Sequence, residues 1–302
     1  LYTGQLYSAV KVLPVQESAT FYGLGSLIAL VFLLAGLFAS LFHLGHPERG
    51  WRSAASWRTS WLSRVVVVLP AFIVITALYG LIHFLDLNPV LFTFRDTFAV
   101  DLSLLVGAVN TAVAFTLFLC TGMIYACIKF LQEWASPLTV VNYTLLGSTS
   151  GFTLATAFAA YQGSGLTQFY GGWAIILTLV SLLTRASSLI RNTRIKHKST
   201  TATAVGIRHA RIEQKSQGFM TGSFNTREFF HGAPQVIFKG IKWLFLLSVF
   251  PLPVVLLALG LSANAAGVFV IAFAVQYAGL LAERWYFFAE ANHPQNLYYQ
   301  TV

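Results

Sequence analysis

Long runs of apolar residues alternate with short polar connections along most of the chain. A helix needs about 20 mainly apolar residues to cross the hydrocarbon core of a bilayer. Runs of about that length lie at Phe21–Phe42, Val65–Leu85, Leu102–Ala126, Thr139–Ala160, Tyr170–Leu189, Trp243–Leu261 and Ala266–Tyr286. The pattern therefore predicts an all-α fold, a polytopic bundle of transmembrane helices in which residues 1–302 form one integral membrane domain.

The start of the chain needs a separate interpretation. Leu1–Val12 is moderately apolar but too short to span a bilayer. It also lacks the basic segment and cleavage site of a signal peptide. We interpret it as the last turns of another helix, which gives seven full spans and the end of an eighth at the N-terminus. Residues 191–240 are predicted to form a long cytoplasmic loop.

The composition agrees with a membrane protein. Hydrophobic residues make up 56% of the chain, charged residues only 10%, and the mean hydropathy is +0.69. A soluble domain carries about 25% charged residues, so the soluble enzyme folds are excluded. Aromatic residues make up 15%, which excludes disorder. Cys120 and Cys127 lie in an apolar run, which indicates small buried side chains rather than a disulfide framework or a metal site.

The positive charges gather on one side of the predicted bundle. The connections at 43–64 and 185–242 carry net charges of +3 and +9, and that side sums to +11 against −2 for the other. Lys and Arg favour cytoplasmic loops. We therefore expect the basic side and the C-terminus to face the cytoplasm. The net charge of +9 is explained by this asymmetry and indicates no nucleic-acid partner.

The first basic connection contains an unusual group of residues. It reads HLGHPERGWR at 43–52 and WRTSWLSR at 57–64. These side chains offer hydrogen-bond donors to a carbonyl, positive charge beside a reduced oxygen, and indoles beside a flat ring. Those are the needs of a quinone head group. The alternative is an aromatic belt combined with the arginines of a cytoplasmic face.

Two further stretches fall on the same side. Glu283 and Arg284 begin the ending ERWYFFAEANHPQNLYY, and they form either an interfacial ion pair or a second wall of the same pocket. The segment Phe224–Gly232 (FNTREFFHG) places phenylalanines in basic surroundings. That combination indicates packing against a partner protein. The alternative is contact with the lipid surface.

Together these motifs resemble the anchor subunit family of dimethyl sulfoxide reductase (DmsC). The pattern H-L-G-x-P-x-R at residues 43–49, followed by WRTSWLS at 57–63, carries the resemblance. MIY at 123–125, W-x-x-P-L-T at 134–139 and the stretches FNTREFFHG and ERWYFFAEANHPQNLYY also fit, so the resemblance covers essentially the whole chain. The family commonly has an acidic residue where this chain has Val65, which puts a proton-accepting role at that position in doubt.

The resemblance implies an eight-helix subunit of the bacterial inner membrane that carries no haem. It implies docking to an iron–sulfur subunit with [4Fe–4S] clusters, which in turn binds a molybdopterin catalytic subunit. The anchor would not act at molybdenum itself but would exchange electrons with a quinone, either ubiquinone or menaquinone. The family's quinol-binding histidine falls on His43. The other expected quinone-site residues are Arg49, Arg52, Trp61, Arg64, Glu283 and Arg284.

The predicted orientation distinguishes between two types of anchor within the family that this chain resembles. Anchors of dimethyl sulfoxide reductase place this histidine on the periplasmic side, whereas the loop charges here place His43 in the cytoplasmic half. That inversion resembles anchors of the cytoplasm-facing sulfite dehydrogenase type. We therefore expect a sulfite:quinone oxidoreductase, with a complex of the dimethyl sulfoxide reductase type, which oxidises quinol, as the alternative.

Two other classes of membrane protein fit less well. A di-haem cytochrome b needs histidine pairs at matching depth, but His43 and His83 fall near opposite faces. A transporter usually has charge near the midplane. The central polar residues here are uncharged and more typical of hydrogen bonds between helices: Asn110, Thr111, Asn142 and Gln276.

Overall fold

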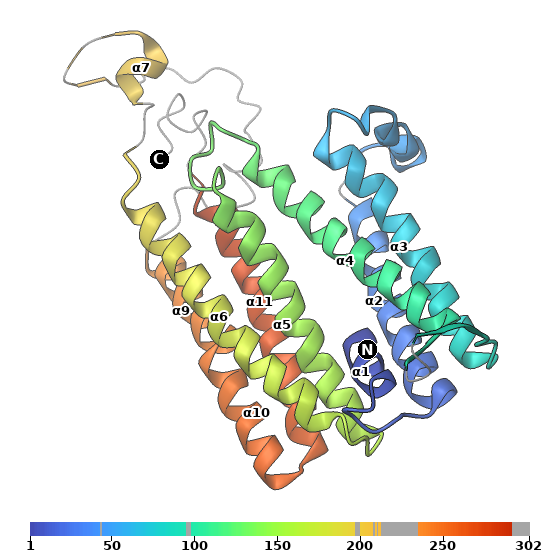
Figure 1. The fold of residues 1–302 in the computed structure, drawn as a ribbon. Coiled ribbons are helices and arrows are strands. Elements are labelled where there is room, and N and C mark those ends of the chain that lie inside the picture. Colours follow the sequence, from blue (N-terminus) through green and yellow to red (C-terminus); the bar gives the residue numbers. More distant parts are fainter. Residues whose placement is uncertain are drawn as a thin grey trace.

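The computed structural model describes residues 1–42, 44–94, 98–196, 200–207, 209, 211–212 and 235–291. Its α-helices are α1 (Tyr2–Ala9), α2 (Leu24–Leu41), α3 (Trp61–Phe84), α4 (Leu102–Ala126), α5 (Pro137–Tyr161), α6 (Thr167–Thr193), α7 (Thr201–Val205), α9 (Gln235–Val249), α10 (Pro251–Ala263) and α11 (Ala266–Ala289). A π-helical turn, η1 (Ser18–Gly23), leads into α2, and a 3-10 segment, η2 (Pro47–Ser56), precedes α3. The prediction of an all-α, polytopic helix bundle is confirmed (Figure 1).

Six of the seven predicted spans coincide with described helices that are long and apolar enough to cross a membrane. The predicted run Leu102–Ala126 coincides with α4, and most of the others start or end a few residues away from the helix. At α3 a capping residue, rather than hydropathy, sets the start of the helix. The Ser60 side chain accepts a hydrogen bond from the Ser63 amide and starts α3 earlier than predicted. The predicted helix within residues 1–12 is α1.

The remaining predicted span, α5, has 25 residues but lacks a continuous stretch as apolar as those in the six others. Its polar side chains lie inside the bundle and are buried: Thr139, Asn142, Thr149, Thr153 and Thr156. Helix α5 packs against α4, α6 and α11, so neighbouring helices rather than lipid surround those positions. Polar residues at helix contacts of this kind satisfy one another by hydrogen bonds, as Thr149 and Ser181 do at 3.1 Å.

The predicted span Trp243–Leu261 is divided between α9 and α10, which together cover Val236–Ala263 as one crossing. Pro251 and Pro253 follow directly after the break at Phe250. Proline lacks an amide donor and clashes with the preceding turn, so the helix is interrupted there. Gln276 of α11 compensates in part, because its amide donates to the Val249 carbonyl at 3.2 Å.

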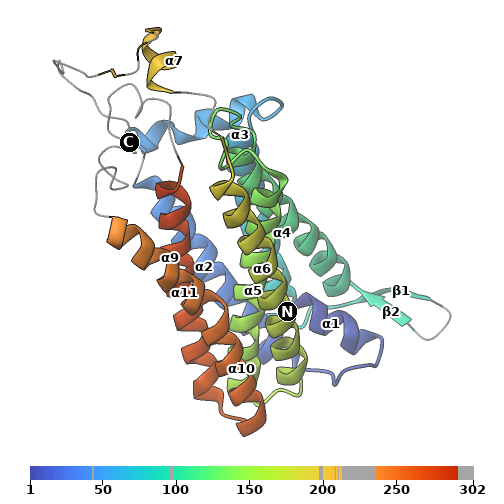
Figure 2. The same ribbon diagram turned by 90° about the vertical axis from the view of Figure 1, so that its left-hand side faces the viewer.

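One element was not predicted. The connection between α3 and α4 forms an antiparallel hairpin of β1 (Val90–Phe94) and β2 (Phe98–Asp101), which projects from the side of the bundle in Figure 2. Asp101 ends the hairpin and caps α4 by accepting from the Leu104 amide at 2.8 Å.

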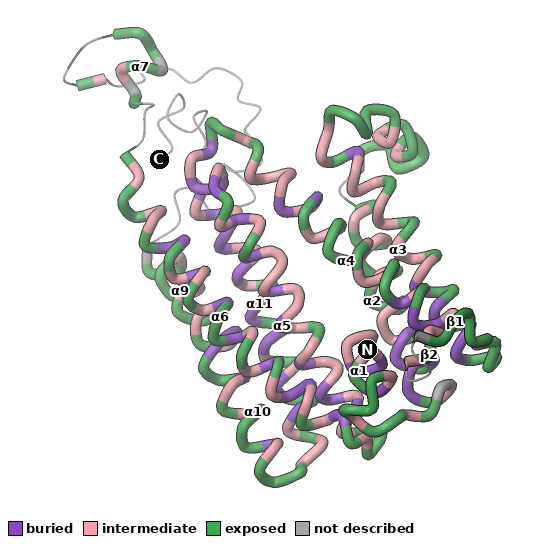
Figure 3. The backbone as a smooth tube through the Cα atoms, in the orientation of Figure 1, coloured by how far each residue is buried: buried purple, intermediate pink, exposed green. Residues whose placement is uncertain are grey.

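The long helices form two groups. Helices α5, α6, α9, α10 and α11 pack together, and α2, α3 and α4 pack together, with the α4–α5 contact joining the groups. Buried positions follow the contact faces, and the outward faces are exposed, as expected when lipid surrounds a bundle (Figure 3). An apolar cavity of about 300 Å³ lies between α2, α3, α4 and α5, next to Leu1 and Tyr2 of the N-terminal segment.

Candidate functional site

The predicted quinone-site residues that the structure describes lie at one end of the bundle, where α3 begins and where α6 and α11 end (Figure 1). They fall into two groups. We call residues 46–64 the arginine–tryptophan segment. We call Arg185, Glu283 and Arg284 the buried ion cluster. His43, Phe224–Gly232 and the tail after Ala291 lie outside the described residues, so the predictions made for them stay predictions.

The arginine–tryptophan segment is held together by contacts among its own residues. Arg64 donates from Nε to the Trp57 carbonyl at 3.0 Å and from Nη2 to the Arg58 carbonyl at 2.9 Å. Its guanidinium also lies over the Trp61 ring, 4.0 Å from the centroid. One side chain at the start of α3 therefore fixes the loop before it.

The rest of this segment is open. Trp51 is 73% exposed, and the Arg52 guanidinium lies over its ring at 5.7 Å. Arg49 has only a long contact, 3.8 Å from Nε to Glu48 Oε1. These positive groups are therefore accessible to an external acceptor, whether the oxygen of a quinone, a lipid phosphate or an acidic partner.

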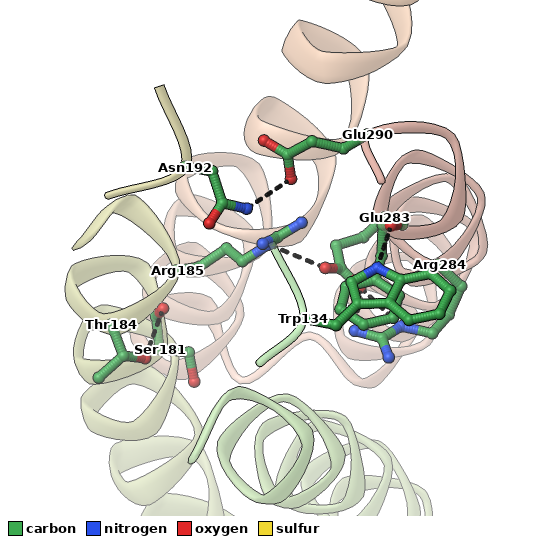
Figure 4. Close-up of polar contacts among 9 residues, drawn as sticks. Trp134, Ser181, Thr184, Arg185, Asn192, Glu283, Arg284 and Glu290 are labelled. Atoms are coloured by element: carbon green, nitrogen blue, oxygen red, sulfur yellow. Dashed lines mark hydrogen bonds and ion pairs between the residues drawn. The ribbon is translucent and has the colours of Figure 1, made fainter. Parts of the chain in front are cut away.

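The buried ion cluster links two helices inside the bundle. Arg185 Nε of α6 lies 2.8 Å from Glu283 Oε1 of α11, and Figure 4 shows the two side chains pointing toward each other. The other carboxylate oxygen, Glu283 Oε2, lies 2.6 Å from Arg284 Nη2. Arg185 and Glu283 are fully buried, whereas the Arg284 side chain is 28% exposed. The carboxylate therefore joins a fully enclosed guanidinium to one that reaches the surface.

Aromatic rings enclose the cluster. The Arg284 guanidinium lies 4.0 Å from the Tyr143 ring centroid and 4.8 Å from that of Phe287, and Arg185 lies 5.6 Å from that of Phe245. Stacking of this kind favours a desolvated cation.

Several buried polar atoms of the cluster and its neighbours have no hydrogen-bond partner among the described residues. Arg185 Nη2, Arg284 Nη1 and Asn142 Oδ1 are buried and unpaired, and all three residues line the same small interior cavity. Two of these atoms are donors and one is an acceptor. Unpaired buried donors are costly, and the cavity has no room for a water molecule, so only movement of the surrounding side chains could give these atoms a partner.

A second layer of polar residues separates the cluster from the surface. Glu290 accepts from the Asn192 amide at 3.1 Å, as Figure 4 shows. Burial raises the pKa of the Glu290 carboxyl above its ordinary value, and the nearby Arg185 guanidinium opposes that rise. Arg191 donates to the carbonyls of Gln132, Glu133 and Ala135 and so holds the loop between α4 and α5 against α6.

The same loop is anchored by Trp134. Its indole donates to the Phe287 carbonyl at 3.0 Å and stacks on the Phe287 ring at 5.2 Å. The Thr139 hydroxyl in the first turn of α5 donates to the Trp134 carbonyl at 2.7 Å. The W-x-x-P-L-T motif thus places a rigid loop directly over the buried ion cluster.

The sequence interpretation missed Arg185. It counted the charge of Arg185 with the connection at 185–242, although the predicted span Tyr170–Leu189 includes this residue; α6 continues to Thr193, and Arg185 is only 2% exposed. Its seven-residue spacing from Thr178, which is also buried, was the available signal.

The structure brings Glu283 and Arg284 together but not with the arginine–tryptophan segment. In the described part of the chain, each group makes its polar contacts within itself or with its own neighbouring helices. The described residues also contain no group of three or more His, Cys, Asp or Glu side chains that could hold a metal ion.

Comparison with known proteins establishes the family. Residues 16–214 match the family described as DMSO reductase anchor subunit (DmsC). The chain belongs to this family. The chain is also 54% identical over 300 residues to the protein named as the C subunit of sulfite dehydrogenase in Allochromatium vinosum, a match that covers 99% of this chain and 92% of the relative. No solved structure matches the chain.

Membership of the DmsC family confirms the resemblance read from the sequence motifs. With the membrane-spanning helices, it identifies the protein as a multi-pass membrane anchor subunit that associates with other subunits of an oxidoreductase complex.

Proposed function

We propose that this protein is the quinone-reacting anchor of a molybdenum and iron–sulfur complex that oxidises sulfite to sulfate. The observation that carries the proposal is the 54% identity, over nearly the whole chain, to a protein named as a sulfite dehydrogenase component. Sulfite oxidation with water releases two electrons and two protons, and quinone reduction consumes two of each. The anchor would therefore take electrons from the iron–sulfur subunit and control the supply of protons to the quinone.

The proposed quinone position is the end of the bundle that bears the arginine–tryptophan segment. When bound, the quinone would be the acceptor of the two electrons. His43 would hold and exchange a proton at one quinone oxygen, because an imidazole titrates near neutral pH. Arg49, Arg52 and Arg64 would favour negative charge on that oxygen, and Trp61 would form a wall beside the ring.

The buried ion cluster would serve the same site from the other group of helices. Glu283 and the Tyr143 ring hold the Arg284 guanidinium in one orientation. The Arg284 side chain is partly exposed, so its guanidinium would contribute positive charge near an oxygen that approaches from outside. Glu290 and Asn192 would connect the cluster to water on the same face.

The same face would receive the partner subunits. We propose that the α4–α5 loop, the arginine–tryptophan segment and the segment Phe224–Gly232 contact an iron–sulfur subunit with [4Fe–4S] clusters, which carries the molybdopterin subunit. The loop is already rigid through Arg191 and Trp134, so little ordering entropy would be lost on docking. The loop charges favour the cytoplasmic side of a bacterial inner membrane for this face.

The decisive experiment is purification of the complex followed by two activity measurements. The proposal expects sulfite-dependent reduction of both a soluble artificial acceptor and a short-chain quinone. His43→Ala should lower the quinone rate about tenfold or more, the scale of a lost acid–base group, and leave the artificial-acceptor rate near normal. The control is His209→Ala, because His209 is exposed, lies outside the arginine–tryptophan segment and contacts the nearby Arg211 carbonyl.

Two other outcomes would contradict the proposed quinone position or the proposed substrate. An unchanged quinone rate in an assembled His43→Ala complex would place the quinone elsewhere. A complex that oxidises quinol with dimethyl sulfoxide, and does not oxidise sulfite, would support the alternative family activity.

A further inference from the structure

A second buried polar network lies at the opposite end of the bundle, where α3 ends and α4 begins. Its centre is Gln5 of α1, which is only 7% exposed. The Tyr79 hydroxyl donates to Gln5 Oε1 at 2.6 Å, and Gln5 Nε2 donates to Ser103 Oγ at 2.5 Å. Gln5 Nε2 also lies 3.4 Å from Nε2 of His83, an imidazole that is 2% exposed. Residues from three helices thus converge on one side-chain amide.

The network leads outward to a carboxylate. The Ser103 hydroxyl donates to Asp101 Oδ1 at 2.9 Å, and the same oxygen caps α4. Each group therefore donates to the next one, from Tyr79 to Gln5, from Gln5 to Ser103 and from Ser103 to Asp101. In this arrangement Gln5 presents its NH₂ group to His83, so His83 Nε2 stands in the position of an acceptor.

The network borders a polar cavity of about 230 Å³. Its lining residues include Ser8, Gln16, Tyr22, His83, Asp86 and Asp101. The Tyr22 hydroxyl is buried, and its neighbour among the described polar side chains is the Ser8 hydroxyl. A polar cavity of this size holds several water molecules, which satisfy such groups.

Two carboxylates and two aromatic rings lie near His83. Asp86 at the end of α3 and Asp101 at the start of α4 line the cavity, and the described lining residues include no Lys or Arg. The Tyr22 and Tyr79 rings lie against the imidazole, with centroids at 4.9 and 4.7 Å. The cavity thus combines two carboxylates, aromatic faces and an imidazole, without a competing cation.

We propose that this cavity is a water-filled proton-binding site, in which His83 binds the proton and the Gln5 amide reverses to accommodate it. Protonation places a hydrogen on both ring nitrogens, and Nε2–H then needs an acceptor. A half-turn of the amide presents Oε1 to His83 and NH₂ to Tyr79. The hydroxyls of Tyr79 and Ser103 can each donate or accept, so the network satisfies both states.

The site can be tested without turnover, by deuterium exchange at the imidazole C2 position in the purified complex, detected by peptide mass spectrometry across pH. His46, whose side chain is 70% exposed, is the internal reference. We expect His83 to exchange with a sigmoidal pH profile. Gln5→Met removes the acceptor for the imidazolium and should move the midpoint to lower pH by about one unit or more, the scale of one hydrogen bond to a charged group.

Gln16→Met is the matched control, because Gln16 lines the same cavity but donates only to the Pro14 carbonyl among its described hydrogen bonds. It should leave the midpoint unchanged. A His83 that stays unexchanged while His46 exchanges fully would overturn the hydrated site. A flat profile would overturn proton binding, and equal midpoints in the two glutamine variants would overturn the role of Gln5.

Discussion

Arg185 and Glu283 form an ion pair of 2.8 Å between α6 and α11, and almost none of either side chain is exposed. Charges within a bilayer are retained where they are paired and serve a function or fix a helix contact. Here the pair sits beneath a rigid loop, at the end of the bundle that also bears the arginine–tryptophan segment. It therefore links the packing of two helices to the surface where partner subunits are proposed to dock.

The first prediction concerns the charge balance of this pair. Glu283→Gln leaves two guanidiniums without a carboxylate, whereas Arg185→Met leaves the Glu283–Arg284 pair intact. Glu283→Gln should therefore lower the stability of the purified protein more, by about 3–5 kcal/mol, the scale for breaking a buried pair. The melting temperatures of the two variants in detergent show which of them is less stable.

The double variant Arg185→Met, Glu283→Gln supplies the control. It retains only Arg284, which can reach the surface, so it should be more stable than Glu283→Gln alone. Equal losses in all three variants would show that side-chain packing, and not charge, decides stability here.

The second prediction is the orientation in the membrane. The basic side sums to +11 and the other side to −2, so the C-terminus is expected in the cytoplasm. A reporter protein that works only in the cytoplasm should therefore be active when it is fused after Val302, and one that works only in the periplasm should be inactive there. A reporter fused after Asn88, in the α3–α4 connection, should behave in the opposite way. Periplasmic activity after Val302 would reverse the topology and would contradict docking of the partner subunits on the cytoplasmic side.

The third prediction tests the loop that lies over the ion cluster. Arg191 holds three backbone carbonyls of the α4–α5 loop, which a lysine ammonium cannot match in geometry. Arg191→Lys should release part of the catalytic subunits from membranes while the anchor itself stays inserted. Immunoblots of membrane and soluble fractions measure the release. Arg194→Lys, at an exposed position at the end of the same helix, should have no effect, and equal retention in both variants would remove the loop from the interface.

The fourth prediction concerns the contact that joins the two groups of helices. A Cβ atom added at Gly122 of α4 would lie 2.9 Å from the Val140 Cα atom of α5, and a backbone atom cannot move aside cheaply. Gly122→Ala should therefore push α4 from α5 and lower the melting temperature. Gly151→Ala on α5, where a Cβ meets nothing within 4 Å, should be neutral or slightly stabilising. Similar melting temperatures for the two variants would argue against close packing at Gly122.

Much of the fold could be predicted because hydropathy is a local property. The run Leu102–Ala126 coincided with α4, and six of seven spans meet the membrane criteria. The motifs at 43–49 and 57–63 also identified the family, which the comparisons confirm. The sequence alone could place Glu283 beside Arg284, because the two are adjacent residues at the end of one helix.

The tertiary structure alone decided which partners the interior polar residues have. Arg185 and Glu283 are 98 positions apart, and Gln5 and His83 are 78 apart, so no local pattern brings either pair together. In the sequence Arg185 was counted with the charges of a loop. In the structure it lies on α6, between Glu283 of α11 and the Phe245 ring. Hydropathy fixes which segments enter the bilayer because each residue contributes independently. Burial of a charge depends on a partner from another helix, and only the packing of the helices supplies that partner.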